Sequence, residues 1–262
     1  MHPSPTGKPQ PEFSVRFAAD DDDLRAAQRL RYRVFVSEMG SDGPLVDHAS
    51  GIEVDRFDAF GNHLLLLDNT RAKDDRVVGV YRLMTAEGAA AAGRFYSAKE
   101  YDLTPILASG RKVLELGRSC LDPEYRGGLG MVHLWNALAD YVTREGVEIL
   151  FGVASFPGTE IDRLKHALSH LNHAFLAPAD LRATAIGANA QRMDLLPPDQ
   201  IDRRLAMVST PPLIKAYLKI GGYVGAGAWV DHDFNTTDVC LILDTARMNE
   251  SQRQLYTKGT AR

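Results

Sequence analysis

The pattern of apolar and polar positions predicts a chain in which strands and helices alternate. Acidic residues at 20–23 precede apolar residues at helical spacing, which favours a helix opened by carboxylates. Runs with strand character and runs with helical spacing then follow one another along the chain. The predicted strands lie at 13–18, 64–68, 77–84, 112–121, 148–155, 228–232 and 238–243, and further helices lie at 132–142, 159–172 and 212–220. This order predicts an α/β domain.

The ends of the chain differ in composition from its middle. Residues 1–11 are rich in proline, which predicts a disordered N-terminal segment, and residues 245–262 form a polar tail. Residues 12–244 are interpreted as a single domain, because no linker or internal repeat divides them. Within it, residues 40–61 form a long polar loop, and loops of this length in a compact domain are usually functional or mobile.

Composition argues against several classes of protein. The 262 residues carry a net charge of −4, whereas nucleic-acid-binding proteins usually need a basic surface. The longest apolar runs are too short to span a bilayer, and the N-terminus lacks the apolar core of a signal peptide. Cys120 and Cys240 lie far apart in apolar strands, which predicts buried thiols in a reducing cytosol. We therefore expect a cytoplasmic protein.

The segment Lys112–Met131 carries the strongest chemical signal. An apolar strand bears one carboxylate, Glu115, and one guanidinium, Arg118, and it runs into a glycine turn at 126–130 that begins a helix. Free backbone N–H groups and the positive end of the helix dipole at such a turn bind an anion, usually a phosphate. No Gly-Lys-Ser/Thr closes the turn, so the pattern favours a pantetheine or CoA-type donor over a nucleoside triphosphate.

Glu115 is the candidate general base for acyl transfer to an amine, acting directly or through a water. Its apolar neighbours should desolvate the carboxylate and raise its pKa. The alternative is a structural ion pair with Arg118 or Arg82, because such networks also perturb pKa values. Strict strand alternation places Glu115 and Arg118 on opposite faces of the sheet. Gly117 between them allows a β-bulge that brings both to one side and frees a backbone N–H for the oxyanion.

Two helical patterns have a packing interpretation beside the functional one. His166, His170 and His173 share one helix face, but no further ligand is spaced to complete a metal site, so we expect packing and no metal. Residues 213–220 form a small amphipathic helix with Lys215 and Lys219 on its polar side. This helix either packs in the core or contacts an acyl chain or a membrane surface.

The order of elements resembles the GNAT N-acyltransferase fold. Within that fold the chain resembles the acyl-homoserine lactone synthases and, more closely, the L-ornithine N-acyltransferases of bacterial ornithine-lipid synthesis. The resemblance rests on RYRVFVSEMG at 31–40, EVDRFDAFGNHLLL at 53–66, LELGRSCLDPEYRG at 114–127, FGVASFPGTE at 151–160, HLNHAFLAPADLRA at 170–183 and PPLIKAYLKIGGYVGAGAWVDHDFNTTDVCLIL at 211–243. The last two segments do not resemble lactone synthases. The resemblance implies a GNAT-like α/β fold: a central mixed sheet splayed between two parallel strands, helices on both faces, and a family-specific elaboration at 176–222.

The resemblance to lactone synthases also implies a set of site residues. It carries over to Arg31, Phe35, Asp55, Asp58 and Arg82 as substrate-binding residues and to Glu115 and Arg118 as catalytic residues. Asp55 and Asp58 would hold the side-chain ammonium of a basic amino acid, while Arg82 or Arg118 would hold its α-carboxylate. The alternative for the two aspartates is loop solvation or a turn motif. One position departs from the pattern, because Ser41 stands where lactone synthases have a tryptophan.

The glycine turn departs from the usual GNAT spacing. Glycines lie one, two and four residues after Arg126, rather than three and five, which weakens a cradle for the CoA pyrophosphate. This spacing points instead to acyl carrier protein as donor, since its thiol arm carries a single phosphate. The implied donor-binding residues are Leu121, Arg126, Gly127, Gly128 and Gly130. The cations expected to receive the acidic surface of the carrier are Arg31, Arg33, Arg126 and Lys165, with solvated surface charge as the alternative.

Together the resemblance implies an N-acyltransferase that moves a 3-hydroxylated long-chain acyl group from acyl carrier protein to the α-amine of L-ornithine, forming lyso-ornithine lipid. It implies no cofactor beyond the acyl-phosphopantetheine thioester as co-substrate, no nucleic-acid partner, and contact with the inner membrane surface, where the product goes. Two alternatives stay open: an acyl-homoserine lactone synthase, which Ser41 disfavours, and a non-catalytic acyl-carrier or lipid-binding module. The sequence does not fix acyl-chain length or the choice among ornithine, lysine and glutamine.

Overall fold

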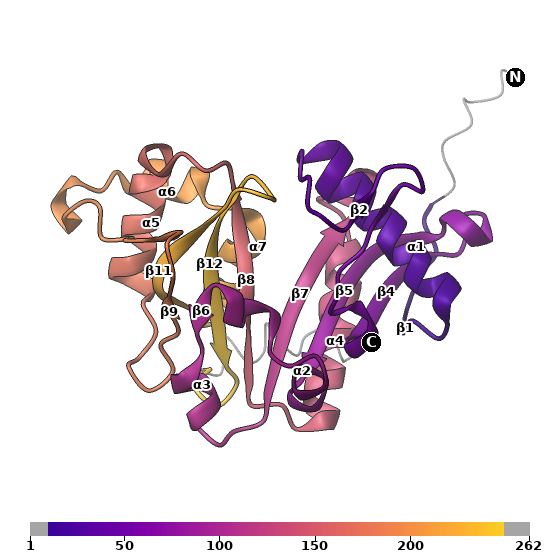
Figure 1. The fold of residues 1–262 in the computed structure, drawn as a ribbon, viewed down its shortest axis with the longest axis horizontal. Helices are drawn as coiled ribbons and strands as arrows, with labels where there is room; N and C mark the ends of the chain where they lie inside the picture. Colours follow the sequence, from indigo (N-terminus) through magenta and orange to yellow (C-terminus); the bar gives the residue numbers. More distant parts are fainter. Residues whose placement is uncertain (1–9, 249–262) are drawn as a thin grey trace, which may run out of the picture.

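One large sheet runs through the molecule and joins its two halves (Figure 1). The computed structural model describes residues 10–248, so most of the predicted N-terminal segment and polar tail lies outside the described residues. The strands are β1 Phe13–Phe17, β4 Asn62–Asp68, β5 Val77–Thr85, β6 Tyr101–Asp102, β7 Val113–Leu121, β8 Ile149–Pro157, β9 Thr184–Ala185, β10 Ala190–Gln191, β11 Tyr223–Asp231 and β12 Thr236–Asp244. They are ordered β1-β4-β5-β7-β8-β12-β11-β9-β6, with β10 beside β11. A separate hairpin pairs β2 Val46–Asp47 with β3 Ile52–Glu53.

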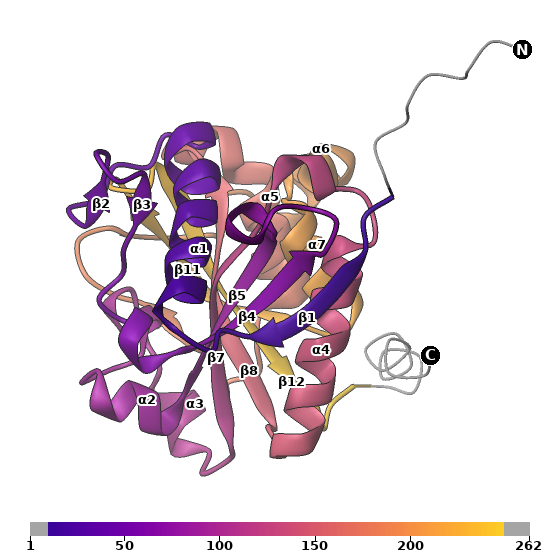
Figure 2. The ribbon, with the colours of Figure 1, turned by 90° about the vertical axis from the view of Figure 1, so that its right-hand side faces the viewer.

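Helices cover both faces of this sheet (Figure 2). They are α1 Asp21–Arg31, α2 Ala86–Ala91, α3 Thr104–Ala108, α4 Gly130–Glu145, α5 Ile161–Phe175, α6 Arg203–Ser209 and α7 Pro212–Lys219. As the acidic run predicts, the Asp20 side chain accepts a hydrogen bond from the Asp23 N–H and caps α1. The chain then continues as a π-helical stretch, Tyr32–Glu38. Such stretches are rare and are frequent at functional sites.

The two faces of the sheet bury separate sets of apolar side chains. On one face Leu30 of α1 packs in a cluster with Leu65 of β4. On the other face Leu134 of α4 packs in a cluster with Leu66 of β4, and α5 and α7 add to the same cluster. Because neighbouring residues of a strand point to opposite faces, a strand buried on both faces is continuously apolar, as the sequence of β4 indicates.

The only long parallel pair in the described sheet separates soon after it forms. Strands β7 and β8 pair in parallel from Val113 to Glu115, opposite Ile149 to Phe151. Beyond this point they diverge, which Figure 1 shows as an opening toward the top of the view. A Cβ atom on Gly152 would lie 2.1 Å from the carbonyl oxygen of Leu116, so glycine is required where the two strands begin to separate.

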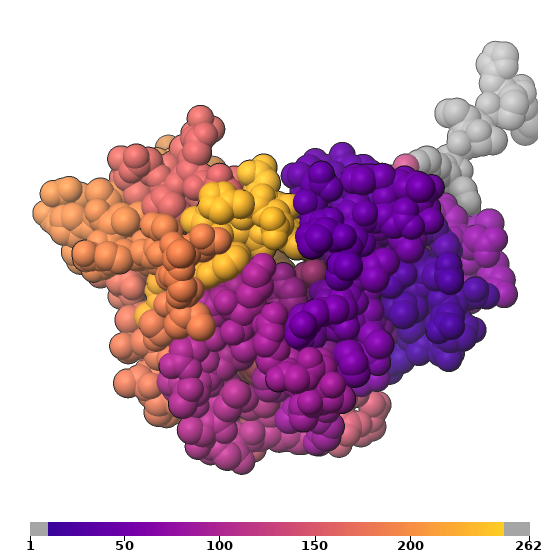
Figure 3. Space-filling model, in the orientation of Figure 1, coloured from indigo at the N-terminus to yellow at the C-terminus, as the bar shows by residue number. Residues whose placement is uncertain are grey.

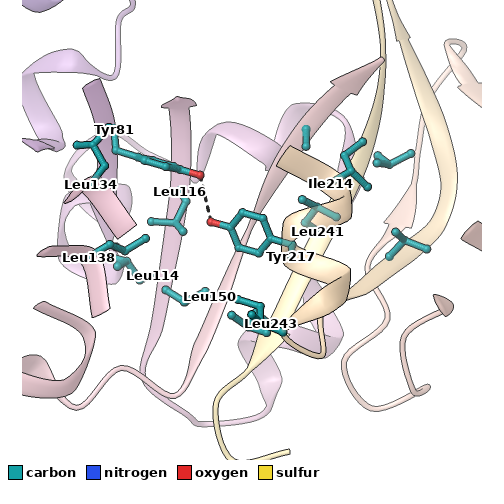
Figure 4. Packing of buried hydrophobic residues seen from close by; sticks show 14 of the residues in the cluster. Tyr81, Leu114, Leu116, Leu134, Leu138, Leu150, Ile214, Tyr217, Leu241 and Leu243 are labelled. Carbon is teal, nitrogen blue, oxygen red and sulfur yellow. Dashed lines mark hydrogen bonds between the residues drawn. The ribbon is translucent and has the colours of Figure 1, made fainter. Parts of the chain in front are cut away.

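Helix α7 lies against the diverging strands. The hydroxyl groups of Tyr217 on α7 and Tyr81 on β5 lie 3.1 Å apart, and the two side chains meet among the leucines drawn in Figure 4. The Tyr217 ring also contacts Trp135 of α4 edge-on, with ring centroids 5.1 Å apart. These contacts join the two halves of the molecule on the face that α4 and α7 share.

Most elements confirm the pattern-based prediction, and the predicted GNAT-like α/β fold is confirmed. The prediction assigned no strand or helix to residues 176–211, and it was wrong there, because this part contains α6 and the short strands β9 and β10. Strand β11 also begins at Tyr223, before the predicted start, and its register against β12 shifts between Val224 and Ala228. In residues 10–248 no helix combines the length and the apolar character needed to cross a membrane.

Candidate active site

A cavity of about 890 Å³ opens where β7 and β8 diverge. The surface is hollowed where the indigo N-terminal half meets the yellow β11–β12 hairpin (Figure 3). The apolar lining from α4 and α7 comprises Met131, Val132, Trp135, Leu213, Ala216 and Tyr217. The polar lining includes Tyr96, Arg118, Ser155, Asp231, Thr236 and Asp238. A cavity of this size with a mostly apolar wall and a few polar groups is typical of a small-molecule site.

The predicted glycine turn lies at the edge of this cavity. Helix α4 begins at Gly130, and no side chain caps its first backbone N–H groups. Arg126, Gly127 and Leu121 line the cavity, whereas Gly128 and Gly130 are not among its lining residues. Gly127 has a φ of 74°, a conformation that favours glycine. Gly130 instead allows the start of α4 to pack closely against β4, because a Cβ there would lie 3.2 Å from a methyl group of Leu66.

A β-bulge in β7 places Arg118 in the cavity wall. In the pairing with β5, Gly117 lies opposite Arg82 and Cys120 opposite Val80, so two residues of β7 face one residue of β5. Arg118 has a φ of 51°, which is uncommon for a residue with a side chain and occurs most often at functional sites. The predicted bulge is therefore confirmed, one residue beyond Gly117.

Buried acids and arginines from four segments form a charge network beside the cavity. Its members are Arg31, Glu53, Asp55, Asp58, Arg82 and Arg118. Arg118 forms ion pairs with Asp55 at 2.6 Å and with Glu53 at 3.3 Å. Arg82 forms ion pairs with two of the same acids, with Asp55 at 2.8 Å and with Asp58 at 3.3 Å. The three arginines and three acids balance in formal charge, as buried charges require.

The structure brings Asp55 and Asp58 together but surrounds them with arginines. Burial would raise the pKa of both carboxyl groups, yet Arg118 and Arg82 hold the pKa of Asp55 below its ordinary value, and Arg31 holds that of Asp58 lower still. Neither aspartate is among the lining residues of the cavity. Their direct contact with a substrate ammonium stays a prediction, and in this arrangement their charge is already compensated.

Arg31 and Phe35 have different surroundings although both lie near the start of the chain. Arg31 is fully buried and binds Asp58 through two N–O contacts of 2.7 Å. The expectation that Arg31 presents charge to a carrier protein is therefore wrong, because a buried guanidinium has no surface to offer. Phe35 lines the cavity, as does Ser41, whose hydroxyl donates to the Phe234 carbonyl at 3.3 Å.

Glu115 is held by backbone and lies outside the cavity lining. One carboxylate oxygen accepts from the Tyr96 N–H at 2.8 Å and the other from the Ser97 N–H at 2.7 Å. Burial raises the pKa of Glu115, while these hydrogen bonds oppose the rise. Glu115 and Arg118 both contact Tyr96. Glu115 accepts from its N–H, and the Arg118 guanidinium lies 4.8 Å from the centre of its ring. Its role as a base stays a prediction, and the geometry gives it a structural task as well.

Sequence reasoning missed the carboxylates that do line the cavity. Within residues 10–248 these are Asp231 at the end of β11 and Asp238 in β12. Burial, with Asp231 nearby, raises the pKa of Asp238 to about 6. The signal available in the sequence was a group of three aspartates, at 231, 233 and 238, in the final hairpin WVDHDFNTTDVC. Arg118 is the guanidinium nearest to them in the lining, and it stacks 5.0 Å from the Phe234 ring of the same hairpin.

The remaining chemical candidates in the sequence have structural partners. Burial raises the pKa of Cys120 to about 12, so this cavity-lining thiol is protonated near neutral pH and is a poor nucleophile. His166 accepts from the Asp202 N–H, and the His173 ring lies 3.1 Å from the Leu196 carbonyl oxygen. His170 contacts Phe175 edge-on. The prediction that this face packs is confirmed only in part, because His166 and His170 are partly buried while His173 is exposed.

Comparison with known proteins agrees with the geometry. The family model described as the acetyltransferase (GNAT) domain matches residues 30–136. An L-ornithine N(alpha)-acyltransferase of Rhodobacter capsulatus is 53% identical over 248 residues, which cover 94% of this chain and 95% of that protein. A protein of the same name from Agrobacterium fabrum is 40% identical over 235 residues, covering 88% of this chain and 80% of that protein.

Solved structures share the fold at low sequence identity. An N-acyl amino acid synthase from uncultured soil microbes superposes with a TM-score of 0.52 at 11% identity, covering 92% of this chain and 94% of that one. A CoA-dependent acyl-homoserine lactone synthase superposes with a TM-score of 0.50 at 14% identity, covering 90% of this chain and 80% of that one. The splayed sheet, its cavity and these matches define the chain as an acyltransferase of the GNAT class. Within that class it belongs to the L-ornithine N(alpha)-acyltransferase family.

Proposed function

We propose that the protein transfers a long-chain, 3-hydroxylated acyl group from acyl carrier protein to the α-amine of L-ornithine and so forms lyso-ornithine lipid. The observation that carries this proposal is the cavity between β7 and β8, which has an apolar wall on α4 and α7 and a polar end at Arg118, Asp231 and Asp238. An acyl chain fits the first and an amino acid fits the second. The names of the related proteins support ornithine as the acceptor.

The glycine turn supports a phosphopantetheine donor. Gly127 lines the cavity beside the uncapped start of α4, where backbone N–H groups and the helix dipole favour a phosphate. A carrier-bound thioester presents one phosphodiester on its thiol arm. A turn without the usual glycine spacing is sufficient to bind this single phosphate group. Arg126 is half-exposed and pairs with Glu38 through contacts of 2.5 and 2.7 Å, so it needs to exchange this partner to meet an acidic carrier surface.

The reaction requires a neutral amine beside an electrophilic carbonyl. After the α-ammonium has lost one proton, its nitrogen attacks the thioester carbon, and the carbonyl electrons move to oxygen. The bulge at Arg118 interrupts the pairing of β7 in the cavity wall, where a backbone N–H outside the regular ladder would stabilise this oxyanion. The intermediate then collapses: the C–N bond stays, the C–S bond breaks, and the leaving thiolate takes up the second proton of the amine.

Arg118 supplies the anchor for the α-carboxylate of the acceptor. Its side chain lines the cavity and is 11% exposed, whereas those of Arg31 and Arg82 are at most 2% exposed. The contacts with Glu53 and Asp55 fix its position, and the rings of Tyr96 and Phe234 flank it. A guanidinium held in this way binds a carboxylate with little further ordering.

Helix α6 supports contact of the enzyme with a membrane surface, where the product has to go. Its exposed residues include Leu205, Met207 and Val208, and Arg203 and Arg204 begin the same helix. Exposed apolar and basic side chains on one short helix are typical of segments that lie at the interface of anionic lipid.

The function is tested by incubating the purified protein with 3-hydroxyacyl-acyl carrier protein and L-ornithine and identifying the lipid product by mass spectrometry. The proposal expects an amide with the mass of 3-hydroxyacyl-ornithine and stoichiometric release of the carrier thiol. Addition of S-adenosylmethionine should change nothing. Formation of a lactone that consumes S-adenosylmethionine, or the absence of any thiol release, contradicts the proposal.

A further inference from the structure

Three buried carboxylates meet at the polar end of the cavity. Glu100 precedes β6, Asp231 ends β11 and Asp238 lies in β12, so segments far apart in sequence converge here. One carboxylate oxygen of each lies within 4.8 Å of one from each of the other two. Glu100 is fully buried, and Asp231 and Asp238 are at most 4% exposed. Three like charges in so small and dry a space repel one another, so the cluster is neutralised either by protons or by a bound cation.

This acidic cluster lacks the partners that such groups normally have. Both oxygens of Glu100 and one oxygen of Asp238 are buried without a hydrogen-bond partner. Across residues 10–248 no lysine, arginine or histidine lies within 4.0 Å of the three carboxylates as an ion pair. Asp231 differs, because one of its oxygens accepts from the N–H groups of Asp233 and Phe234 at 2.9 Å. Buried acids without partners are rare in folded proteins, and a cation bound at the cavity would supply the contact that these oxygens lack.

The acids of the neighbouring charge network, unlike those of this cluster, are paired with arginines. There Glu53, Asp55 and Asp58 are matched by arginines at contacts as short as 2.6 Å. The Glu100–Asp231–Asp238 cluster has an excess of negative charge, and Arg118 lies between the two groups, already bound to Glu53 and Asp55. Burial, together with the neighbouring acids, raises the pKa of Glu100 well above its ordinary range and that of Asp238 to about 6.

We infer that the Glu100–Asp231–Asp238 cluster binds the side-chain ammonium of the amino-acid acceptor and so selects a dibasic amino acid. Asp231 and Asp238 line the cavity and make the contact, and Glu100 adds charge from behind them. This inference rests on the proposed function for the identity of the acceptor, and it replaces Asp55 and Asp58 as the direct partners of that ammonium.

The surroundings of the cluster favour an alkylammonium over a divalent cation. The rings of Tyr96 and Phe234 line the same end of the cavity and offer an apolar face to a methylene chain. Arg118 acts electrostatically on Asp238, and a fixed guanidinium repels a divalent ion more strongly than a singly charged ammonium, while it attracts a carboxylate. An amino acid with one carboxylate and a second amine matches this pairing of opposite charges, with its α-amine left between the two anchors.

The test compares L-ornithine with L-norvaline, which has the same carbon chain without the second amine. The wild-type protein should prefer ornithine in kcat/KM, and Asp238→Asn and Asp231→Asn should each reduce this preference by about 10–100-fold, the loss of one charge-assisted contact. The KM for the acyl donor should stay within about 2-fold, below the tenfold effect of a single contact. Asp231→Asn keeps an oxygen for the two N–H groups it accepts from, so its fold is preserved. Asp233→Asn removes an exposed carboxylate from the same hairpin and should leave the preference unchanged.

Isothermal titration of ornithine and norvaline without donor separates this inference from the proposed function. Ornithine binding that is lost in Asp238→Asn, in a protein that turns over no donor, supports the inference while the proposed function fails. An ornithine preference that survives in both variants overturns the inference although turnover persists. Tight binding of Mg²⁺ or Ca²⁺ that is lost in the same variants and competes with ornithine also overturns it, because the cluster is then a metal site.

Discussion

Arg118 binds Asp55 across an N–O distance of 2.6 Å, and this contact joins the cavity wall to the buried charge network. The network therefore acts on the substrate through one guanidinium. Its other members fix where that guanidinium lies, while the bulge in β7 turns it toward the cavity. A residue such as Asp55 is in this sense a positioning residue, because its effect on the acceptor passes through Arg118.

Replacement of Asp55 tests this indirect role. Asp55→Asn should raise the KM for ornithine more than the KM for the acyl donor, because Arg118 loses its closest acid and its fixed position. It should also lower the free energy of unfolding by about 3 kcal/mol, since a buried charge pair is broken. Steady-state kinetics with both substrates and chemical denaturation measure the two effects. Asp74→Asn, at an exposed position, is the control. Equal changes in both KM values would assign Asp55 a purely structural role.

Glu115→Gln distinguishes a base from a structural acceptor. The glutamine amide nitrogen cannot accept from a backbone N–H, so either the Tyr96 or the Ser97 N–H loses its partner. We expect the free energy of unfolding to fall by about 1–3 kcal/mol and turnover to fall with it. The pH dependence of kcat/KM should keep its shape. A variant of normal stability whose turnover is about 100-fold lower, the size of general-base loss, would restore Glu115 as the base.

Donor preference follows from the single-phosphate interpretation of the glycine turn. Acyl carrier protein should be used much more efficiently than acyl-CoA of the same chain, and added salt should raise the KM for the carrier form more than that for the CoA form. Arg126→Gln should weaken only the carrier form. Rates measured with both donors across a range of ionic strength provide the comparison. Equal efficiency at every salt concentration would place the protein with CoA-dependent acyltransferases.

Asp238 should make the empty protein less stable as pH rises. Its pKa in the folded state is about 6, above the ordinary 3.8, so between these values the folded protein holds more protons than the unfolded one. Stability is then lost as pH rises from about 4 through about 6. Burial and the nearby Asp231 and Glu100 oppose the ionisation of Asp238, whereas the hydroxyl groups of Ser155 and Thr236 and the Arg118 guanidinium favour it.

Asp238→Asn consequently should raise the melting temperature at pH 7.5 and have little effect near pH 4. Each kcal/mol recovered corresponds to about 2–4 °C for a chain of this size. Thermal unfolding of both proteins across this pH range measures the difference. A variant that is less stable than wild type at pH 7.5 would mean that the Asp238 carboxylate already has a stabilising partner in the empty protein.

The sequence predicted the fold well because the strands and helices of the core follow simple periods. The continuous apolar run of β4 and the acidic start of α1 each determine their structure locally. Helix α6 was missed because its seven residues expose much of their apolar surface, so no buried face repeats at helical spacing. The prediction for strand β11 was too short because a register shift and two glycines, Gly225 and Gly227, interrupt its pattern.

The site was predicted only in part for a physical reason. The bulge at Arg118 and the glycine turn are local, and the sequence indicates both. Whether an acid faces an arginine or an empty cavity depends on pairing across the sheet, which no short segment encodes. Asp55 and Asp231 are both buried aspartates at the ends of apolar or aromatic segments, yet one meets two guanidinium groups and the other lines the cavity.

The position of the new amide bond tests the account most directly. L-Ornithine labelled with ¹⁵N at the α-amine is acylated from 3-hydroxyacyl-acyl carrier protein, and NMR identifies the nitrogen that bears the acyl group. With the side-chain ammonium held at Asp231 and Asp238 and the carboxylate at Arg118, the account predicts acylation of the labelled nitrogen. An acyl group on the side-chain nitrogen, or no amide at all, would contradict it.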